Sequence, residues 1–114
     1  MELFDANIER LERALDLRTR NQNLIASNLA NIDTPGYQAR RLDFAASMER
    51  ALEGGDPNPV IGLSPEPAVS LDGNNVDLDR ELAEMGRNRT MYQLTAQILA
   101  ARFRQLATVF DHTQ

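Results

Sequence analysis

Two long stretches with apolar residues at helical spacing stand at opposite ends of the chain, and this arrangement constrains the fold most. In the first stretch the apolar side chains follow at intervals typical of one helix face, at Phe4, Ile8, Leu11, Leu15, Ile25, Leu29 and Ile32. Arg18 and Gln22 interrupt this line. Residues 1–34 contain neither Pro nor Gly, so the pattern predicts a helix of about 30 residues and about 45 Å. Such a helix is longer than a compact domain of this size.

The second stretch predicts another long helix, which Asn75 or Asp77 would cap. Its apolar line runs through Leu78, Leu82, Met85, Tyr92, Ala96, Leu99, Phe103, Leu106 and Phe110, with Arg89 as its interruption. A further line through Met91, Leu94 and Ile98 indicates contacts with more than one partner helix. Acidic side chains at Asp77, Asp79 and Glu81 suit the positive end of the helix dipole. Gly86 inside this helix predicts a kink or a close backbone contact.

The segment between the two helices is irregular. Pro35 and Gly36 end the first helix after Thr34 and predict a type II turn with a positive φ at Gly36. Residues 38–53 suggest a short amphipathic helix with Asp43 as N-cap and Gly54 as its end. Residues 54–70 hold four prolines and three glycines and predict a loop, in which residues 60–63 and 68–71 could pair as a small hairpin.

These elements define a mainly all-α fold class. We expect an N-terminal helix (1–34), a connector with a turn, a short helix and the Pro/Gly-rich loop (35–70), and a C-terminal helix (71–114). The two long helices would pack as an antiparallel coiled-coil hairpin. Because two helices bury only one face each, the 114-residue chain is expected to assemble with other copies or partners.

Composition excludes most chemistry. The chain has no Cys, no Trp and a single histidine, His112, near the C-terminus. A net charge of −5 argues against nucleic-acid binding, and no apolar run is long enough for membrane insertion. The run Asp72–Asp77 lacks the ligand spacing of a calcium loop and fits a turn followed by a helix cap. We therefore expect no enzyme activity, no catalytic residues, no metal and no cofactor.

The helix seams supply the candidate interaction residues. Assembly contacts are expected at the apolar positions Ile8, Leu11, Leu15, Ile25, Leu29, Leu82, Met85, Tyr92, Leu99, Phe103 and Leu106. The interrupting residues Arg18, Gln22 and Arg89 either fix the register between helices or subunits, or point to solvent where the seam turns away. Both interpretations remain open. All 12 basic residues are Arg, which suits interface pairing but is explained equally well by codon usage.

One motif is specific enough to indicate a family. The run Ala26–Tyr37 resembles the N-terminal signature of the bacterial flagellar rod and hook proteins, Ala-Asn-x-x-Thr-Pro-Gly-Tyr. The matching or adjoining residues that we take as motif residues are Asn28, Asn31, Thr34, Pro35, Gly36 and Tyr37. The asparagines can bond the last helical carbonyls or a neighbouring chain. Residues 38–40, 43–44 and 70–85, together with Tyr92, resemble the proximal-rod members of this family.

The resemblance implies a structural role without turnover. Such subunits leave the cell through the flagellar type III apparatus without a cleaved signal, assemble helically into the periplasmic proximal rod of the basal body, and transmit motor torque. Implied partners are further copies of the chain, the adaptor protein FliE, the next rod protein FlgC, the export gate and the ring proteins. The absence of a signal-peptide pattern at residues 1–5 fits this route. The alternative is a soluble helical regulator or export chaperone that binds a partner helix.

Overall fold

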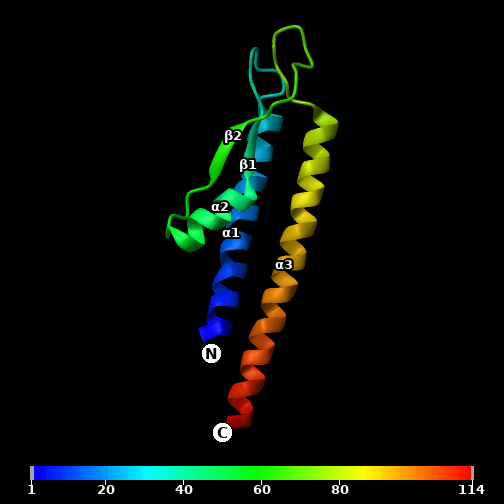
Figure 1. Ribbon diagram of the computed structural model, residues 1–114. Coiled ribbons are helices and arrows are strands. Elements are labelled where there is room, and N and C mark those ends of the chain that lie inside the picture. Colours follow the sequence, from blue (N-terminus) through cyan, green and yellow to red (C-terminus); the bar gives the residue numbers. More distant parts are fainter. Residues whose placement is uncertain (1, 114) are drawn as a thin grey trace.

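The computed structural model describes residues 2–113 and the side chains of residues 5–112. Its elements are α1 (Glu2–Ala30), β1 (Arg40–Asp43), α2 (Phe44–Glu53), β2 (Val60–Leu63) and α3 (Leu78–Thr113). The molecule is a rod of 67 × 27 × 16 Å, in which α1 and α3 lie side by side while β1, β2 and α2 cover a flank of α1 (Figure 1). The prediction of a mostly helical chain with two long terminal helices is confirmed.

The two long helices run in opposite directions. Hydrogen bonds join Asn21 to Asn88 and Asn28 to Glu81, so rising numbers on α1 meet falling numbers on α3. Both chain ends consequently lie at the same end of the rod, where α3 extends beyond α1 (Figure 1). No helix within residues 2–113 is both long and apolar enough to cross a lipid bilayer.

The first helix ends at Ala30, four residues before the predicted end at Thr34. The N–H of Asn31 is shared between the carbonyls of Ser27 and Asn28, and the N–H of Ile32 bonds the carbonyl of Leu29, so the bonding tightens into turns. The expected positive φ at Gly36 is confirmed at 71°. The chain therefore leaves α1 through consecutive turns, because these bonds already satisfy the last carbonyls of the helix.

The segment 38–53, in which a short helix was expected, is helical only after its predicted N-cap, Asp43. Residues 40–43 form β1, which pairs antiparallel with β2 in the register Arg40 to Leu63 and Asp43 to Val60, so the part of the segment before the cap is not helical. The predicted caps are confirmed, since the Asp43 carboxylate accepts from the Ala46 N–H at 3.0 Å and Gly54 ends α2. Helical periodicity around residue 42 could not reveal the cross-strand bonds that hold this segment extended.

The hairpin prediction was right for residues 60–63 and wrong for their partner. β1 pairs with them, whereas residues 68–71 lie in a turn whose N–H groups at Val69 and Ser70 bond the carbonyl of Asn74. The expected contact at Gly86 is also wrong. A Cβ there would meet nothing within 4 Å, and α3 is continuous from Leu78 to Thr113.

The core is small and half polar. Its buried apolar side chains are Leu17, Leu24, Ile25, Ala39, Ala51 and Val76. A slightly larger set of polar side chains is buried with them, namely Asn28, Ser47, Ser64, Asn74, Asn75, Glu81 and Asn88. Most of these residues lie where α1, β1 and the start of α3 meet, so the region around the motif is held by hydrogen bonds as much as by apolar packing.

Candidate assembly site

Asn28 connects several parts of the motif region through hydrogen bonds. Its side chain is fully buried, and the amide oxygen accepts from the Tyr37 hydroxyl and the Arg40 N–H, both at 3.0 Å. The amide nitrogen donates to the Arg40 carbonyl at 2.9 Å and to the Glu81 carboxylate at 3.2 Å. All four hydrogen-bonding positions of the side chain are thus used. Asn28 fastens α1 to the strand β1 and to the first turn of α3 within a single protomer.

Glu81 was expected to serve the helix dipole, but the structure gives it a more specific role. The Asp77 carboxylate accepts from the N–H groups of Asp79 and Arg80 and caps α3. Glu81 is instead 0% exposed, with Oε1 at 2.7 Å from Nη2 of Arg41 on β1. An ion pair and the Asn28 bond therefore hold this carboxylate in the core, since a buried charge without partners would be strongly destabilising.

Two consecutive asparagines, Asn74 and Asn75, hold the turn that precedes α3. Asn74 donates to the carbonyls of Asn31 and Thr34 at 2.9 and 2.7 Å, and so closes the end of α1. Asn75 accepts from the Ala39 N–H at 2.6 Å. The predicted turn is confirmed, but its bonds to the motif were missed. Their signal in the sequence was the adjacent pair of amide side chains beside a helix start.

The same turn contains one carboxylate with a shifted pKa. The Ser70 hydroxyl donates to the Asp72 carboxylate, and the Asn74 N–H donates to it at 3.0 Å. These hydrogen bonds, the Ser70 bond most of all, lower the pKa of Asp72 because they favour the ionised form.

The remaining motif residues divide between the helix end and the surface. Asn31 donates to the Ser27 carbonyl at 2.8 Å, which is the expected bond to a last helical carbonyl, and it accepts from the Thr34 hydroxyl. Thr34, Pro35 and Gly36 are exposed, and their turn lies at the end of the molecule opposite the chain ends (Figure 1). The motif thus has two parts: Asn28 and Tyr37 make hydrogen bonds inside the protomer, and residues 34–36 form an exposed turn.

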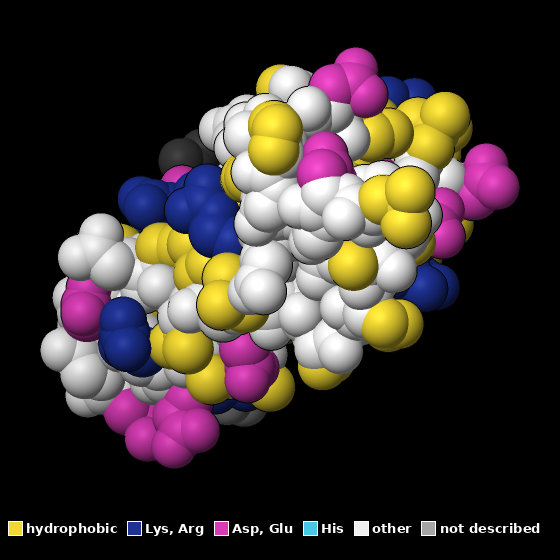
Figure 2. Space-filling view, turned by 90° about the horizontal axis from the view of Figure 1, so that it is seen from above, with side chains coloured by type: hydrophobic (Ala, Val, Ile, Leu, Met, Phe, Trp, Pro, Cys, Tyr) yellow, Lys and Arg dark blue, Asp and Glu magenta, His cyan; other side chains and the backbone are white. Residues whose placement is uncertain are grey.

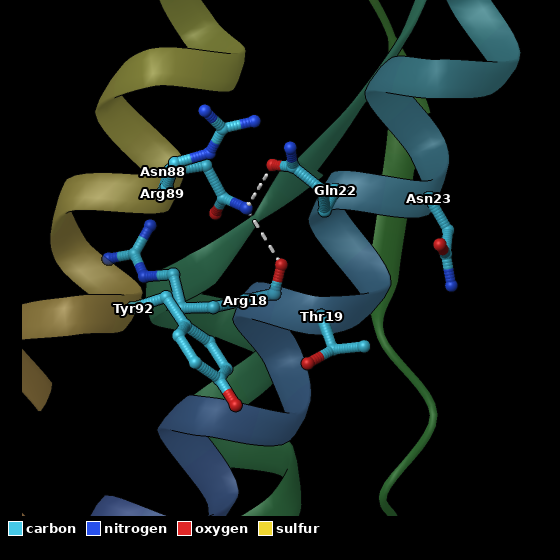
Figure 3. Close-up of a pocket in the computed structure, with 7 residues that line it drawn as sticks. All are labelled: Arg18, Thr19, Gln22, Asn23, Asn88, Arg89 and Tyr92. Atoms are coloured by element: carbon cyan, nitrogen blue, oxygen red, sulfur yellow. Dashed lines mark hydrogen bonds between the residues drawn. The ribbon is translucent and has the colours of Figure 1, made fainter. Parts of the chain in front are cut away.

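A second polar cluster lies halfway along the helix pair. A pocket of about 250 Å³ opens between α1 and α3 (Figure 3), and its walls are formed by Arg18, Thr19, Gln22, Asn23, Asn88, Arg89 and Tyr92. Asn88 is 3% exposed and donates to Gln22 Oε1 and to the Arg18 carbonyl, both at 2.8 Å. Gln22 therefore lies in the helix interface, while Arg89 is exposed. Asn88, which the sequence interpretation missed, is the polar residue of α3 that points inward at this pocket.

The predicted assembly positions differ widely in exposure. Ile25 is buried within the protomer at 3% exposure. Three positions on α3 are 41–50% exposed, namely Leu82, Tyr92 and Phe103. The rest are intermediate, at Ile8, Leu11, Leu15, Leu29, Met85, Leu99 and Leu106. Because Glu81 and Asn88 take the inward face of α3, its apolar line is turned partly away from α1.

Apolar surface remains uncovered on the other line of α3 as well. Met91, Leu94 and Ile98 are 38–48% exposed, and near the chain end Val109 and Phe110 are 47% and 54% exposed. The view from above shows apolar side chains at the surface between acidic and basic ones (Figure 2). No group of three or more His, Cys, Asp or Glu residues suited to a metal occurs in the described part of the chain. Fold and surface together define a helical subunit of a larger assembly.

Comparison with known proteins identifies that assembly. Residues 8–38 match the model of the family described as "Flagella basal body rod protein". The chain is 33% identical to the flagellar basal body rod protein FlgB of Escherichia coli K12, over 97% of each chain. It is 32% identical to FlgB of Bacillus subtilis 168 over 96% of each, and 31% identical to FlgB of Borrelia hermsii over 96% of this chain and 98% of the relative.

The chain belongs to the FlgB family of flagellar basal body rod proteins, which confirms the resemblance seen in the motif and in residues 70–85. Its function is that of a structural rod subunit of the flagellar basal body, and its relatives are structural proteins rather than enzymes. The alignment with the Escherichia coli protein spans 134 positions although this chain has 114 residues, so the relative carries segments that this chain lacks.

Proposed function

We propose that the chain assembles helically into the proximal, periplasmic part of the rod and transmits motor torque there. It would reach this place through the flagellar type III apparatus without a cleaved signal. The observation that carries the proposal is the uncovered apolar surface of α3, on which Leu82 and Phe103 are about half exposed. Such surface is stabilising only when another chain covers it.

We also propose that α1 and α3 form a coiled-coil hairpin in the inner layer of the rod. Their opposite directions and the polar bonds at Asn88 and Glu81 support this, because single polar residues in a helix interface fix its register. The exposed apolar positions Leu82, Tyr92 and Phe103 would then contact neighbouring subunits, and the partly covered ones would complete those contacts. Ile25 would act indirectly, because it is buried inside the protomer and stiffens α1.

Stiffness is what torque transmission requires of the subunit. Asn28, Glu81 and Arg41 join α1, α3 and β1 at one point, while Asn88 joins the two helices at a second. Polar contacts at two separate places along a helix pair resist sliding of one helix past the other better than contacts at one place, because both sets fix the same register. Proposed neighbours are further copies of this chain, the adaptor FliE, the next rod protein FlgC, the export gate and the ring proteins.

Cysteine cross-linking in purified basal bodies tests this proposal. The chain has no cysteine, so Phe103→Cys introduces a single thiol at an exposed apolar position of α3. We expect the variant to co-purify with basal bodies and to form cross-linked species there. Glu49→Cys, on the exposed side of α2, is the matched control. A protein that stays in the cytoplasm and never co-purifies with basal bodies would instead indicate the regulator or chaperone, which the rod-protein relatives disfavour.

A further inference from the structure

The pocket between α1 and α3 holds an arginine, Arg18, whose cationic group has no acidic partner among residues 5–112. The guanidinium carbon of Arg18 lies 3.9 Å from the centre of the Phe44 ring, so this ring covers one face of the cation. Its Nε is buried and has no hydrogen-bond partner in the described part of the chain. Burial lowers the pKa of Arg18 because the charged form loses hydration. A buried donor without an acceptor is destabilising, so the site favours an incoming anion.

A second cation stands at the same pocket. Arg89 reaches it from α3, and its guanidinium and that of Arg18 lie on either side of the Asn88 amide (Figure 3). Within residues 5–112 no carboxylate lies at ion-pair distance from either arginine, although Arg20, Arg41, Arg50, Arg80 and Arg87 each have one. Planar guanidinium groups bind carboxylates with two parallel hydrogen bonds, which makes a carboxylate the fitting ligand.

The same chain offers carboxylates that are equally unpaired. Asp5, Glu9 and Glu12 are exposed, and none has an ion-pair partner among the described residues. Their spacing of four and three residues places them on one face of α1. Glu9 stands nine residues before Arg18, which is about 14 Å along a helix. Because both groups belong to one rigid helix, they cannot meet within a protomer.

We propose that the Arg18–Arg89 pocket binds the acidic face of α1, formed by Asp5, Glu9 and Glu12, of a second copy of this chain. The contact joins different surfaces of the two copies. It shifts one copy relative to the other along the helix axes by about the distance between the pocket and the acidic face. Contacts between different surfaces form closed rings when the copies are related by a closing rotation, whereas the displacement proposed here generates an open helical assembly. The inference rests on the proposed helical assembly and specifies one of its contacts.

Charge reversal with rescue tests the contact in cells that make complete basal bodies. Arg89→Glu should reduce the number of rods per cell about tenfold, because it places like charges opposite each other. Arg104→Glu is the matched control, since Arg104 is also an exposed α3 arginine with no ion pair among the described residues, and it should change the number less than twofold. Adding Glu12→Arg to Arg89→Glu should restore rods to within about twofold of the wild type.

A disulfide between two single-cysteine variants provides an independent measurement that does not depend on folding of a charge variant. Thr19→Cys lies at the pocket rim and Glu12→Cys on the acidic face. When both variants are expressed together, we expect oxidised basal bodies to contain the mixed dimer in at least about tenfold excess over either variant expressed alone. Equal effects of the two arginine reversals, failure of the rescue, or absence of the mixed dimer would each overturn the contact. In all three cases wild-type protein in the basal bodies would leave the proposed function intact, whereas its absence would refute that function as well.

Discussion

Replacement of Glu81 by alanine removes the ion pair with Arg41 and the hydrogen bond with Asn28 that connect α3 to β1 and α1. The change removes a carboxylate that is 0% exposed and leaves Arg41, 2.7 Å away, without its counter-charge. Breaking a buried ion pair from one side costs about 3–5 kcal/mol. Because the Arg41 side chain is 29% exposed and can regain water, the lower end applies. The Asn28 amide also loses one acceptor, so we expect a loss of about 3 kcal/mol in the free energy of unfolding.

Urea unfolding followed by far-UV circular dichroism measures this loss. With a slope of about 1.5 kcal/mol per molar urea, the midpoint should fall by about 2 M. Glu84→Ala is the matched control on the same helix, because its pair with Arg87 is 33% and 69% exposed and should contribute less than about 0.5 kcal/mol. If both variants lowered the midpoint equally, the buried pair would not hold the helices together, and the account of the motif region would be wrong.

Four further substitutions and a change of pH have clear expected outcomes. Asn28→Ala removes a hydrogen-bond partner from the buried Glu81 carboxylate and from part-buried groups of Tyr37 and Arg40, and should lower the free energy of unfolding by at least about 2 kcal/mol in the same urea assay. Leu17→Ala, at a side chain 2% exposed, should cost about 2–5 kcal/mol, and a cost below about 0.5 would show that this position is not core. Gly86→Ala should stabilise α3 by about 0.5–1 kcal/mol. Gly36→Ala should destabilise the turn by about 1 kcal/mol, because Gly36 has a positive φ. If thermal unfolding showed that both variants change the stability in the same direction, the distinction between the two glycines would be refuted. The lowered pKa of Asp72 means that its turn is stabilised at neutral pH and loses that contribution as the pH falls through this pKa, which amide exchange across a pH series would reveal; protection unchanged at acid pH would contradict it.

The helices could be predicted because their signals are local. The apolar spacing from Ile8 to Leu29 and the absence of Pro and Gly from residues 1–34 are properties of adjacent residues, and the Asp43 and Gly54 caps follow from the same local chemistry. The sequence pattern predicts the end of α1 four residues too late, because Pro35 is the first strong local stop signal after the helix start. The chain actually leaves the helix where the side chain of Asn31 satisfies a carbonyl of the last turn.

The strands and the polar core could not be predicted in the same way. Residues 40–43 become a strand because residues 60–63 bond to them across the connector, and no local pattern encodes such a choice of partner. Glu81 and Asn88 looked like surface residues of a charged helix. They are buried because Arg41, Asn28, Gln22 and the Arg18 carbonyl converge on them from distant parts of the sequence.

By itself, then, the sequence determined two long helices separated by an irregular connector, a specific turn after the first helix and membership in a family of rod proteins, because periodicity, caps and motifs act over a few residues. The tertiary structure alone decided which face of α3 turns inward. The face with Glu81 and Asn88, whose side chains are buried and hydrogen-bonded, turns inward in place of the apolar line. An unpaired polar group in the core would cost more free energy than a half-exposed leucine does. Because that face of α3 points inward, the apolar line of α3 stays partly uncovered and can contact other chains.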